Sequence, residues 1–166
     1  MVFPLFSPLT LYKMTLFKQC FLFCGFIFSF HFCAGLGARI PNFNDSCVRC
    51  LCHVAGCDFN RGCSDGYCGP FFISRVYWVD ADKPTLPDDD PNRKEAYEDC
   101  ARDYHCSVNI IQSYMTKFGK DCNGDGVTDC FDYMMINYHG GRACSAPLYL
   151  SEAGRRWLSR YKQCRF

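Results

Sequence analysis

Cysteine is the residue that most constrains this chain, with 15 in 166 residues. Three of them, Cys20, Cys24 and Cys33, lie in an apolar segment near the N-terminus. An even, dense set of cysteines in a short chain is typical of a disulfide framework, which stabilises domains too small to bury a large core. The remaining twelve are Cys47, Cys50, Cys52, Cys57, Cys63, Cys68, Cys100, Cys106, Cys122, Cys130, Cys144 and Cys164.

The pairing of these cysteines stays open, because twelve cysteines allow on the order of ten thousand connectivities. A zinc site is the competing interpretation, since Cys47-x-x-Cys50 and the neighbouring Cys52 have ligand-like spacing. An oxidising compartment forms disulfides from such pairs first. We therefore expect up to six disulfide bonds.

The apolar segment over residues 20–34 contains no charged residue and follows Lys13 and Lys18. It is shorter than the roughly 20 residues that a membrane helix needs, and small residues come directly after it. These features predict a signal peptide over residues 1–38, cleaved within about 34–38, and hence a secreted, extracellular protein. An uncleaved N-terminal anchor is the alternative.

Asn44-Asp45-Ser46 is an N-glycosylation sequon. In a protein that enters the secretory pathway, such a sequon predicts a glycan on a surface residue. Asn44 is therefore a candidate glycosylation site near the new N-terminus.

Charge is nearly balanced once the signal peptide is removed. Lys13 and Lys18 leave with it, so 16 of the 18 Lys and Arg remain against 17 Asp and Glu. This balance provides no global field for nucleic acid or for a membrane. The C-terminal stretch is locally basic, which is typical of a solvated helix face and can also contact anionic bacterial surfaces. Its basic residues are Arg155, Arg156, Arg160, Lys162 and Arg165.

The part that remains after cleavage has the length of a single domain, which we place over 47–166, after a short segment at 39–46. Six cysteines and four glycines within 47–72 indicate a short helix, tight turns and small strands. The stretch KPTLPDDDPN at 83–92 is typical of a surface loop. We therefore expect irregular structure in the first half of the domain.

The second half has helical periodicity. One apolar stripe contains Ala96, Cys100 and Ala101, and the next contains Val108, Ile111, Met115 and Phe118. A third helix is predicted over 132–138, and Ser151 is a candidate cap for a fourth. The whole domain is therefore predicted to be mainly helical α+β.

The order and spacing of several motifs resemble one family. The motifs are Cys50-x-Cys52, Gly56-Cys57, Cys68-Gly69, Phe72-Ile73, Tyr77-Trp78, Cys100, Cys106, Tyr114-Met115, Ile136, Gly140-Gly141 and Cys144. They resemble the invertebrate-type lysozymes, also called the destabilase family, over nearly all of 47–164, and residues 114–130 are most similar to an arthropod branch. The resemblance implies a monomeric lysozyme-like fold with a saccharide cleft, peptidoglycan as partner and no required cofactor.

The resemblance also implies hydrolysis of the β-1,4 bond between N-acetylmuramic acid and N-acetylglucosamine. One carboxylic acid protonates the leaving oxygen while a second carboxylate attacks or stabilises the oxocarbenium-like centre. Active members of the family carry the acid in a Cys-x-x-Glu-Ser-Gly-Cys segment. The corresponding segment here, CHVAGC at 52–57, is one residue shorter. Ala55 or the gap therefore stands at the position of the glutamate.

Asp58 and Asp65 are the carboxyl groups that remain for catalysis. Asp58 follows Cys57 directly, and Asp65 lies in a shortened stretch where active members have an Asp. Asp65 precedes Gly66 and is at least as typical of a turn. The missing glutamate favours a glycan-binding protein with impaired or lost muramidase activity. An active lysozyme with Asp58 or Asp65 as a substituted general acid is the alternative.

Some members of the family are also credited with isopeptidase activity, which needs a nucleophile activated by an adjacent base. Ser64, together with His139 or Lys120, could supply these groups, although their spacing does not single them out. A histidine before Gly140 is more typical of a helix C-terminus, where a cation suits the helix dipole.

The segment DCNGDGVTDCFD at 121–132 has the pattern of a twelve-residue calcium loop, with the turn glycine at position 6. Position 12 is Asp rather than the longer bidentate Glu. Disulfides at Cys122 and Cys130 could also hold the loop without metal, so a structural Ca²⁺ and a disulfide-held loop both stay open. The candidate ligands are Asp121, Asn123, Asp125, Asp129 and Asp132.

Overall fold

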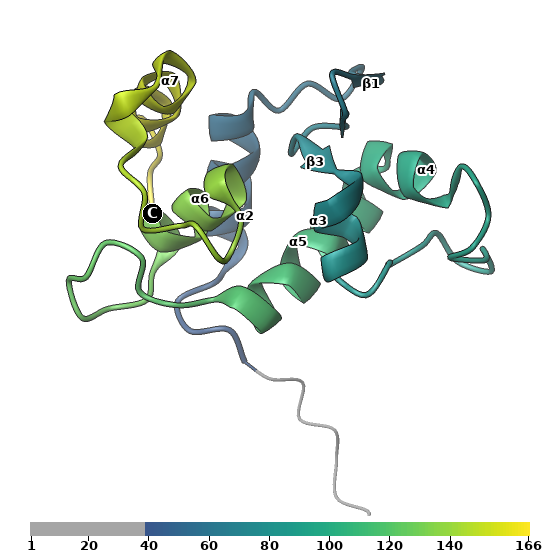
Figure 1. The fold of residues 1–166 in the computed structure, drawn as a ribbon, viewed down its shortest axis with the longest axis horizontal. Helices are drawn as coiled ribbons and strands as arrows, with labels where there is room; N and C mark the ends of the chain where they lie inside the picture. Colours follow the sequence, from purple (N-terminus) through teal and green to yellow (C-terminus); the bar gives the residue numbers. More distant parts are fainter. Residues whose placement is uncertain (1–38) are drawn as a thin grey trace, which may run out of the picture. The chain divides into compact units, whose positions relative to one another are not determined.

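The computed structural model describes residues 39–166, so the predicted signal peptide over 1–38 lies outside the described residues. The described elements are α2 (Asp45–Ala55), β1 (Cys63–Ser64), β2 (Tyr67–Cys68), β3 (Ile73–Ser74), α3 (Arg75–Asp80), α4 (Ala96–Arg102), α5 (Tyr104–Phe118), α6 (Cys130–His139), the 3-10 helix η2 (Leu148–Leu150) and α7 (Glu152–Tyr161) (Figure 1). This order confirms the predicted mainly helical α+β fold.

None of the helices within 39–166 has both the length and the apolar character needed to cross a membrane.

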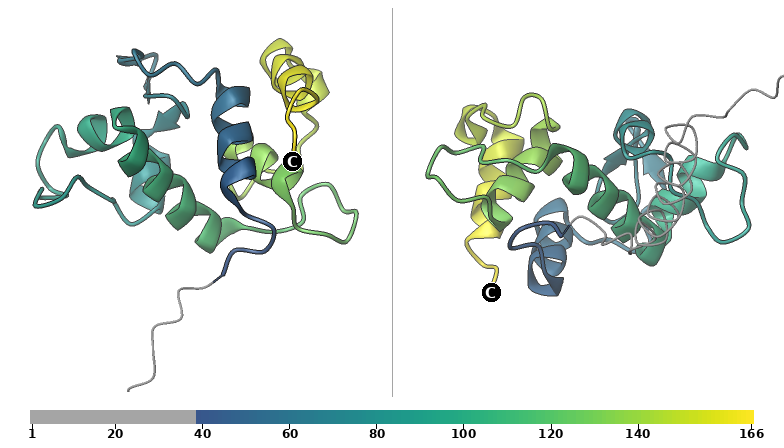
Figure 2. Two further views of the ribbon diagram at one scale, coloured as in Figure 1. Left: turned by 180° about the vertical axis from the view of Figure 1, so that it is seen from behind. Right: turned by 90° about the horizontal axis from the view of Figure 1, so that it is seen from below.

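Helix α2 is the central element of the helical part, since it packs against both α6 and α7 (Figures 1 and 2). It begins at Asn44, whose side chain accepts a hydrogen bond from the Cys47 backbone N at 3.0 Å. It ends at Gly56, which has the left-handed φ of 108° that terminates many helices. Leu51 and Val54 are completely buried on its inner face.

The small sheet is antiparallel, in the order β1-β2-β3. Asp65 and Gly66 form the two-residue turn between β1 and β2, with φ values of 53° and 82°. Positive φ at both positions is the signature of a type I′ hairpin turn, whose twist matches that of the strands. The predicted tight turns and small strands of 47–72 are thus confirmed.

Helix α3 is an element that the sequence pattern did not predict. It begins directly after β3, where the Ser74 side chain accepts a hydrogen bond from the Tyr77 backbone N at 3.2 Å. Tyr77 stacks on Tyr114 of α5 with 3.6 Å between ring centroids, and the Trp78 indole donates to the Pro84 carbonyl at 2.7 Å. Six residues are too few for a helical period to stand out in sequence.

The predicted apolar stripes lie on α4 and α5. Ala96, Cys100 and Ala101 are fully buried on α4, and Ile111 and Met115 are buried on α5. The two helices are separated at Asp103, which has extended backbone and caps α5 by accepting a hydrogen bond from the Cys106 backbone N at 2.8 Å. The predicted helix at 132–138 is present as α6, and Ser151 caps α7 as predicted.

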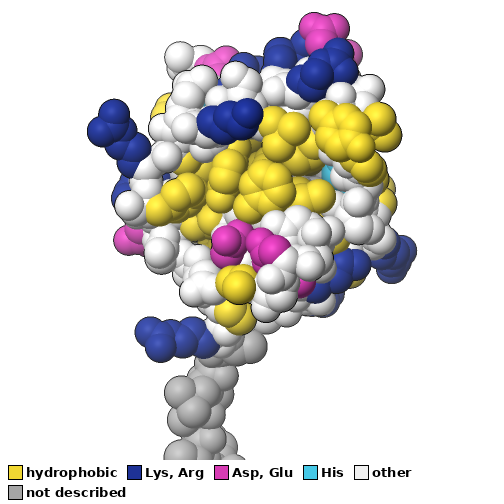
Figure 3. Space-filling model, turned by 90° about the vertical axis from the view of Figure 1, so that its left-hand side faces the viewer, with side chains coloured by type: hydrophobic (Ala, Val, Ile, Leu, Met, Phe, Trp, Pro, Cys, Tyr) yellow, Lys and Arg dark blue, Asp and Glu magenta, His cyan; other side chains and the backbone are white. Residues whose placement is uncertain are grey.

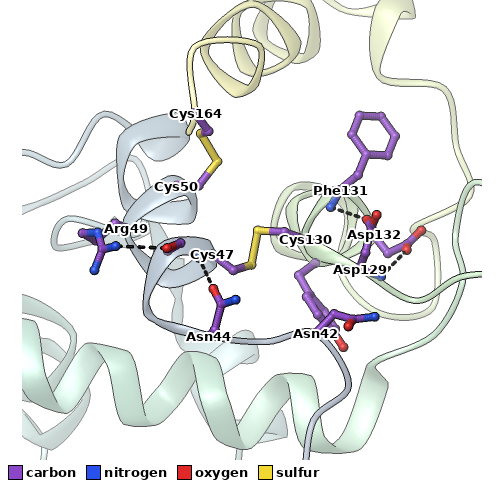
Figure 4. The surroundings of a disulfide bond; sticks show 12 residues. Asn42, Asn44, Cys47, Arg49, Cys50, Asp129, Cys130, Phe131, Asp132 and Cys164 are labelled. Atoms are coloured by element: carbon purple, nitrogen blue, oxygen red, sulfur yellow. Dashed lines mark hydrogen bonds between the residues drawn. A yellow bond between two sulfur atoms is a disulfide. The ribbon is translucent and has the colours of Figure 1, made fainter. Parts of the chain in front are cut away.

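All twelve cysteines predicted to form bridges are paired, in six disulfides. The pairs are Cys47–Cys130, Cys50–Cys164, Cys52–Cys57, Cys63–Cys68, Cys100–Cys106 and Cys122–Cys144. Figure 4 shows the two bonds that fasten α2 to distant segments, Cys47–Cys130 to α6 and Cys50–Cys164 to the chain after α7. The zinc interpretation of Cys47, Cys50 and Cys52 is wrong, because each bonds a different cysteine.

On the face seen in Figure 3, hydrophobic side chains gather over a broad area with Lys and Arg side chains around its edge.

Aromatic rings pack in series between α6 and the C-terminus. The ring of Tyr161 lies 5.2 Å from that of Phe131 and 5.7 Å from that of Phe166, centroid to centroid. These contacts hold the C-terminal segment against the helical part.

Candidate functional site

The largest cavity described within 39–166 has a volume of about 700 Å³. The C-terminal end of α2, the hairpin, the end of α6 and one face of α7 form its walls. Its lining residues are Ala55, Gly56, Asp58, Arg61, Tyr67, Phe72, Asn137, Tyr138, Ala153, Arg156, Trp157 and Arg160. It therefore brings together residues that lie about a hundred positions apart in the sequence.

The charge of this cavity is positive. Arg61, Arg156 and Arg160 line it, whereas Asp58 is the one acidic residue among its lining residues. Within residues 39–166, neither Arg61 nor Arg160 forms an ion pair. Arg156 pairs with Glu152 at 2.5 Å, but both side chains are mostly exposed, and such surface pairs contribute little.

Helix α7 presents two of these arginines because Arg156 and Arg160 are four residues apart and so share a face. The Arg160 guanidinium donates from Nη1 to the Val54 carbonyl at 2.9 Å, which ties α7 to the last turn of α2. Gly154 allows the start of α7 to pack closely, since a Cβ there would lie 2.0 Å from the Leu148 carbonyl oxygen.

Aromatic side chains form the other part of the cavity wall. Trp157 meets Tyr138 edge to face, with 5.1 Å between ring centroids. Phe72 lies beside Tyr67, and the Arg61 guanidinium stands 4.2 Å above the Phe72 ring centroid. Phe72 has a φ of 59°, a strained backbone conformation for a bulky residue and one that clusters at functional sites.

The residues considered for the catalytic site lie in different places in the structure. Ala55 is the last residue of α2, and its buried methyl group faces the cavity. Asp58 also lines the cavity; it is exposed, and its Oδ1 accepts a hydrogen bond from the Asn60 backbone N at 3.0 Å. Asp65 occupies the hairpin turn and is not among the lining residues. Only one of the two candidate carboxyl groups therefore belongs to the cavity.

The other groups considered for catalysis lie elsewhere. His53, a residue of the shortened 52–57 segment, is exposed on α2 and lines a separate cavity of about 340 Å³ with Arg49 and Arg165. Ser64 is on β1, Lys120 follows α5, and His139 ends α6. None of these three lines any of the cavities described above. Burial lowers the pKa of His139, which opposes the predicted cationic role at the helix C-terminus.

The carboxylates of the 121–132 loop accept hydrogen bonds from the backbone of the loop. Asp132 is completely buried; its Oδ1 accepts from Cys122 N at 2.8 Å and Asn123 N at 3.3 Å, and its Oδ2 accepts from Asp129 N at 2.9 Å. Asp121 accepts from Gly124 N and Gly126 N, which lowers its pKa.

This arrangement does not supply the bidentate ligand that a calcium loop has at position 12, because both Asp132 oxygens face amides. Among the residues described, no three His, Cys, Asp or Glu side chains converge as metal ligands would. Two disulfides anchor the loop to the rest of the domain, since Cys122 bonds Cys144 and Cys130 bonds Cys47. The present loop shape is accounted for by these bonds, and calcium binding stays a prediction.

Asn44, the predicted glycosylation site, is exposed at the start of α2. Its Oδ1 makes the cap, while a glycan would be attached through Nδ2. The cavity residues that the sequence did not single out include Arg61, Asn137, Tyr138 and Trp157. For Arg156 and Arg160 a signal was present, since they belong to the basic C-terminal stretch, which is typical of a solvated helix face and can also contact anionic surfaces.

Comparison with known proteins agrees with this architecture. A lysozyme of Ostrea edulis is 32% identical over 116 residues, covering 65% of this chain and 74% of the relative. Invertebrate-type lysozyme 6 of Caenorhabditis elegans is 26% identical over 117 residues, covering 68% and 83%. A chain from the crystal structure of Aeromonas hydrophila PliI in complex with Meretrix lusoria lysozyme superposes with a TM-score of 0.56 at 20% identity, over 75% of this chain and 95% of that chain, and so shares the fold.

Residues 44–164 match the Destabilase family. This range covers every helix and strand described here. It leaves out the described residues before α2 at 39–43 and the last two residues of the chain. The order of elements, the disulfide-rich core and the lysozyme relatives all agree with the match. The chain therefore belongs to the Destabilase family, the family of the invertebrate-type lysozymes.

Proposed function

We propose that this chain is a secreted member of the family that binds bacterial peptidoglycan or a related glycan, with muramidase activity impaired or lost. The observation that carries the proposal is the composition of the cavity, which has three arginines and a single carboxyl group in its lining. A cavity of this size, with aromatic side chains and several convergent polar groups in its walls, falls within the range of ligand sites.

The chemistry of glycoside hydrolysis explains why this composition matters. Retaining and inverting enzymes place two carboxyl groups on either side of the scissile bond, roughly 5–5.5 Å or 6.5–9.5 Å apart. Here Ala55 or the gap stands where the family acid is expected, and Asp65 lies in the hairpin turn. Asp58 alone cannot fill both roles, whereas sugar binding needs neither carboxyl group.

The test measures hydrolysis and binding on the same material. The full chain is expressed in eukaryotic cells, recovered from the medium and incubated with purified insoluble peptidoglycan, beside an active invertebrate-type lysozyme. We expect the protein to sediment with peptidoglycan without releasing reducing sugar ends. Trp157→Ala should abolish sedimentation, whereas Tyr149→Ala, an exposed aromatic residue outside the cavity, should not.

Melting curves of both variants control for misfolding, because Trp157 also packs against the core. Release of reducing ends that Asp58→Asn abolishes would show an active lysozyme with a substituted general acid. Failure of the wild-type protein to sediment would contradict glycan binding. Retention of the chain in the cell pellet would contradict secretion.

Isopeptidase activity is not part of this proposal, since no contact brings Ser64 next to His139 or Lys120. Calcium binding by the 121–132 loop is tested separately, by terbium luminescence and by the change in melting temperature on adding calcium. A signal in either would support a structural Ca²⁺, and silence in both would leave the loop held by its disulfides and backbone hydrogen bonds.

A further inference from the structure

Two of the cavity arginines have guanidinium groups without a carboxylate partner among residues 39–166. Arg61 and Arg160 are both partly buried, so each has lost some of its contact with water. A partly desolvated cation without a counter-charge is unfavourable in the free protein. A ligand that supplies the missing negative charge would therefore gain from both residues.

Arg61 is held in a position to receive such a ligand. Its guanidinium carbon lies 4.2 Å from the centroid of the Phe72 ring, and this cation–π contact holds the group beside the cavity. Phe72 takes its place through a strained φ of 59°. Backbone strain at the residue that supports a cavity arginine is expected where the site has a function.

Arg160 and Arg156 approach the same cavity from α7. Arg160 is fixed by one hydrogen bond to the Val54 carbonyl at 2.9 Å, which leaves its other donors unused within the described residues. The exposed pair of Arg156 with Glu152 can exchange for a stronger contact, because such surface pairs contribute little. Asp58 offsets only one of the three positive charges.

We infer that this cavity selects an acidic glycan, a saccharide that carries carboxylate or sulfate groups bound by Arg61, Arg156 and Arg160. This inference rests on the proposed glycan-binding function of the same cavity. The guanidinium fork matches the geometry of such oxyanions with two parallel N–H···O bonds. Trp157, Tyr138 and Tyr67 add aromatic surface to the lining, on which the apolar side of a sugar can pack, and so favour a saccharide over a free anion.

The experiment compares tetrasaccharides that differ in charge. Isothermal titration of the full-length secreted protein uses neutral chitotetraose, a hyaluronan tetrasaccharide with carboxylates, and a chondroitin sulfate tetrasaccharide with added sulfates. We expect at least one acidic tetrasaccharide to bind at least tenfold more tightly than chitotetraose. Raising NaCl from about 0.05 M to 0.5 M should reduce this preference, because salt screens charge pairs. The better acidic ligand identifies the oxyanion.

Three substitutions remove one positive charge each within the cavity, Arg61→Gln, Arg156→Gln and Arg160→Gln. Each should weaken binding of the acidic ligand about tenfold and binding of chitotetraose by much less, so that the preference for the acidic ligand falls. Arg155→Gln is the matched control, since Arg155 neighbours Arg156 on α7 but does not line the cavity. Melting curves show whether loss of the Arg160 bond to Val54 disturbs the fold. Arg61→Lys, which keeps the charge but not the fork, should recover only part of the affinity.

The outcomes separate this inference from the proposed function. Equal affinity for neutral and acidic tetrasaccharides, with peptidoglycan binding intact, would overturn the charge selectivity and leave glycan binding standing. No binding of any tetrasaccharide or of peptidoglycan would overturn both. An acidic preference that Arg155→Gln reduces as much as Arg156→Gln would assign the effect to the general charge of α7 and overturn the role of the cavity.

Discussion

Asp132 shows how a single carboxylate organises the chain between α5 and α6. It is completely buried and accepts three backbone hydrogen bonds, from Cys122, Asn123 and Asp129. Together with Asp129 it forms a capping box at the start of α6. The side chain that the sequence pattern predicts as a calcium ligand thus has a defined role as a hydrogen-bond acceptor.

Asp121 gives a prediction about pH. Hydrogen bonds from Gly126 N and Gly124 N favour its charged form and hold its pKa below the usual 3.8. A carboxyl group whose pKa is lowered on folding stabilises the protein above its unfolded-state value, and this contribution is lost as the pH falls through the folded-state value. We expect Asp121→Asn to lower the melting temperature at pH 6, and the difference from wild type to shrink below about pH 4. A difference that grows on acidification would contradict this assignment.

Candidate residues and their positions were predictable to different degrees. The sequence identified Asp58 and Asp65 as the remaining carboxyl candidates near the shortened segment. Which of them lines the cavity depends on a hairpin turn that includes Asp65 and not Asp58. An Asp-Gly pair is a turn signal in sequence, but that Asp65 does not line the cavity is seen only in the folded structure.

At the scale of elements, the close contact of the hairpin with α4 depends on Gly69. A Cβ at this position would lie 1.7 Å from the Ala101 carbonyl oxygen, and the glycine also has a left-handed φ of 67°. Any residue with a Cβ would therefore both clash with α4 and adopt a strained backbone conformation at this position. This contact fixes the hairpin, and with it Tyr67, against the helical elements.

Gly69→Ala is accordingly expected to destabilise the protein by at least about 3 kcal/mol, through the clash and the backbone strain. Gly62→Ala is the matched control in the same region, because a Cβ there meets nothing within 4 Å, and its effect should be within about 0.5 kcal/mol. Urea denaturation followed by circular dichroism measures both. Similar losses for the two variants would show that the hairpin moves to accommodate the methyl group.

Helices with apolar periodicity or a cap residue were predictable from sequence, and the short helix α3 was not. Helices α4, α5, α6 and α7 follow apolar stripes or a capping serine that can be read directly. Helix α3 is only six residues long, and it depends on the stacking of Tyr77 on Tyr114 from a helix far along the chain. Tertiary contacts of this kind decide short elements and leave no local pattern.

At the scale of the whole molecule, the disulfides differ in how much chain they close. Cys50–Cys164 spans 114 residues, whereas Cys63–Cys68 spans five. The number of bonds was predictable from the cysteine count, but their pairing was not. The lining of the cavity could not be predicted from the sequence either. Arg61 and Arg160 come to the same cavity only when α7 packs on α2.

Loop-closure entropy predicts different losses when these bonds are removed. The Cys47–Cys130 bond already shortens the loop that Cys50–Cys164 closes, so Cys50→Ser with Cys164→Ser should lose about 4 kcal/mol of unfolding free energy. Cys63→Ser with Cys68→Ser should lose about 2 kcal/mol. Guanidinium denaturation of both double variants makes the comparison. Equal losses would show that native-state contacts, and not chain entropy, set the contribution of these bonds.

The bond from Cys50 to Cys164 can form only at the end of synthesis of the protein. Cys50 leaves the ribosome 114 residues before its partner, and Arg156 and Arg160 are made shortly before that partner. The hairpin, its own disulfide and Asp58 can all be complete while the opposite wall of the cavity is still missing. A chain interrupted before Cys164 would therefore keep the carboxyl side of the cavity and lack the bond that fastens its arginine side.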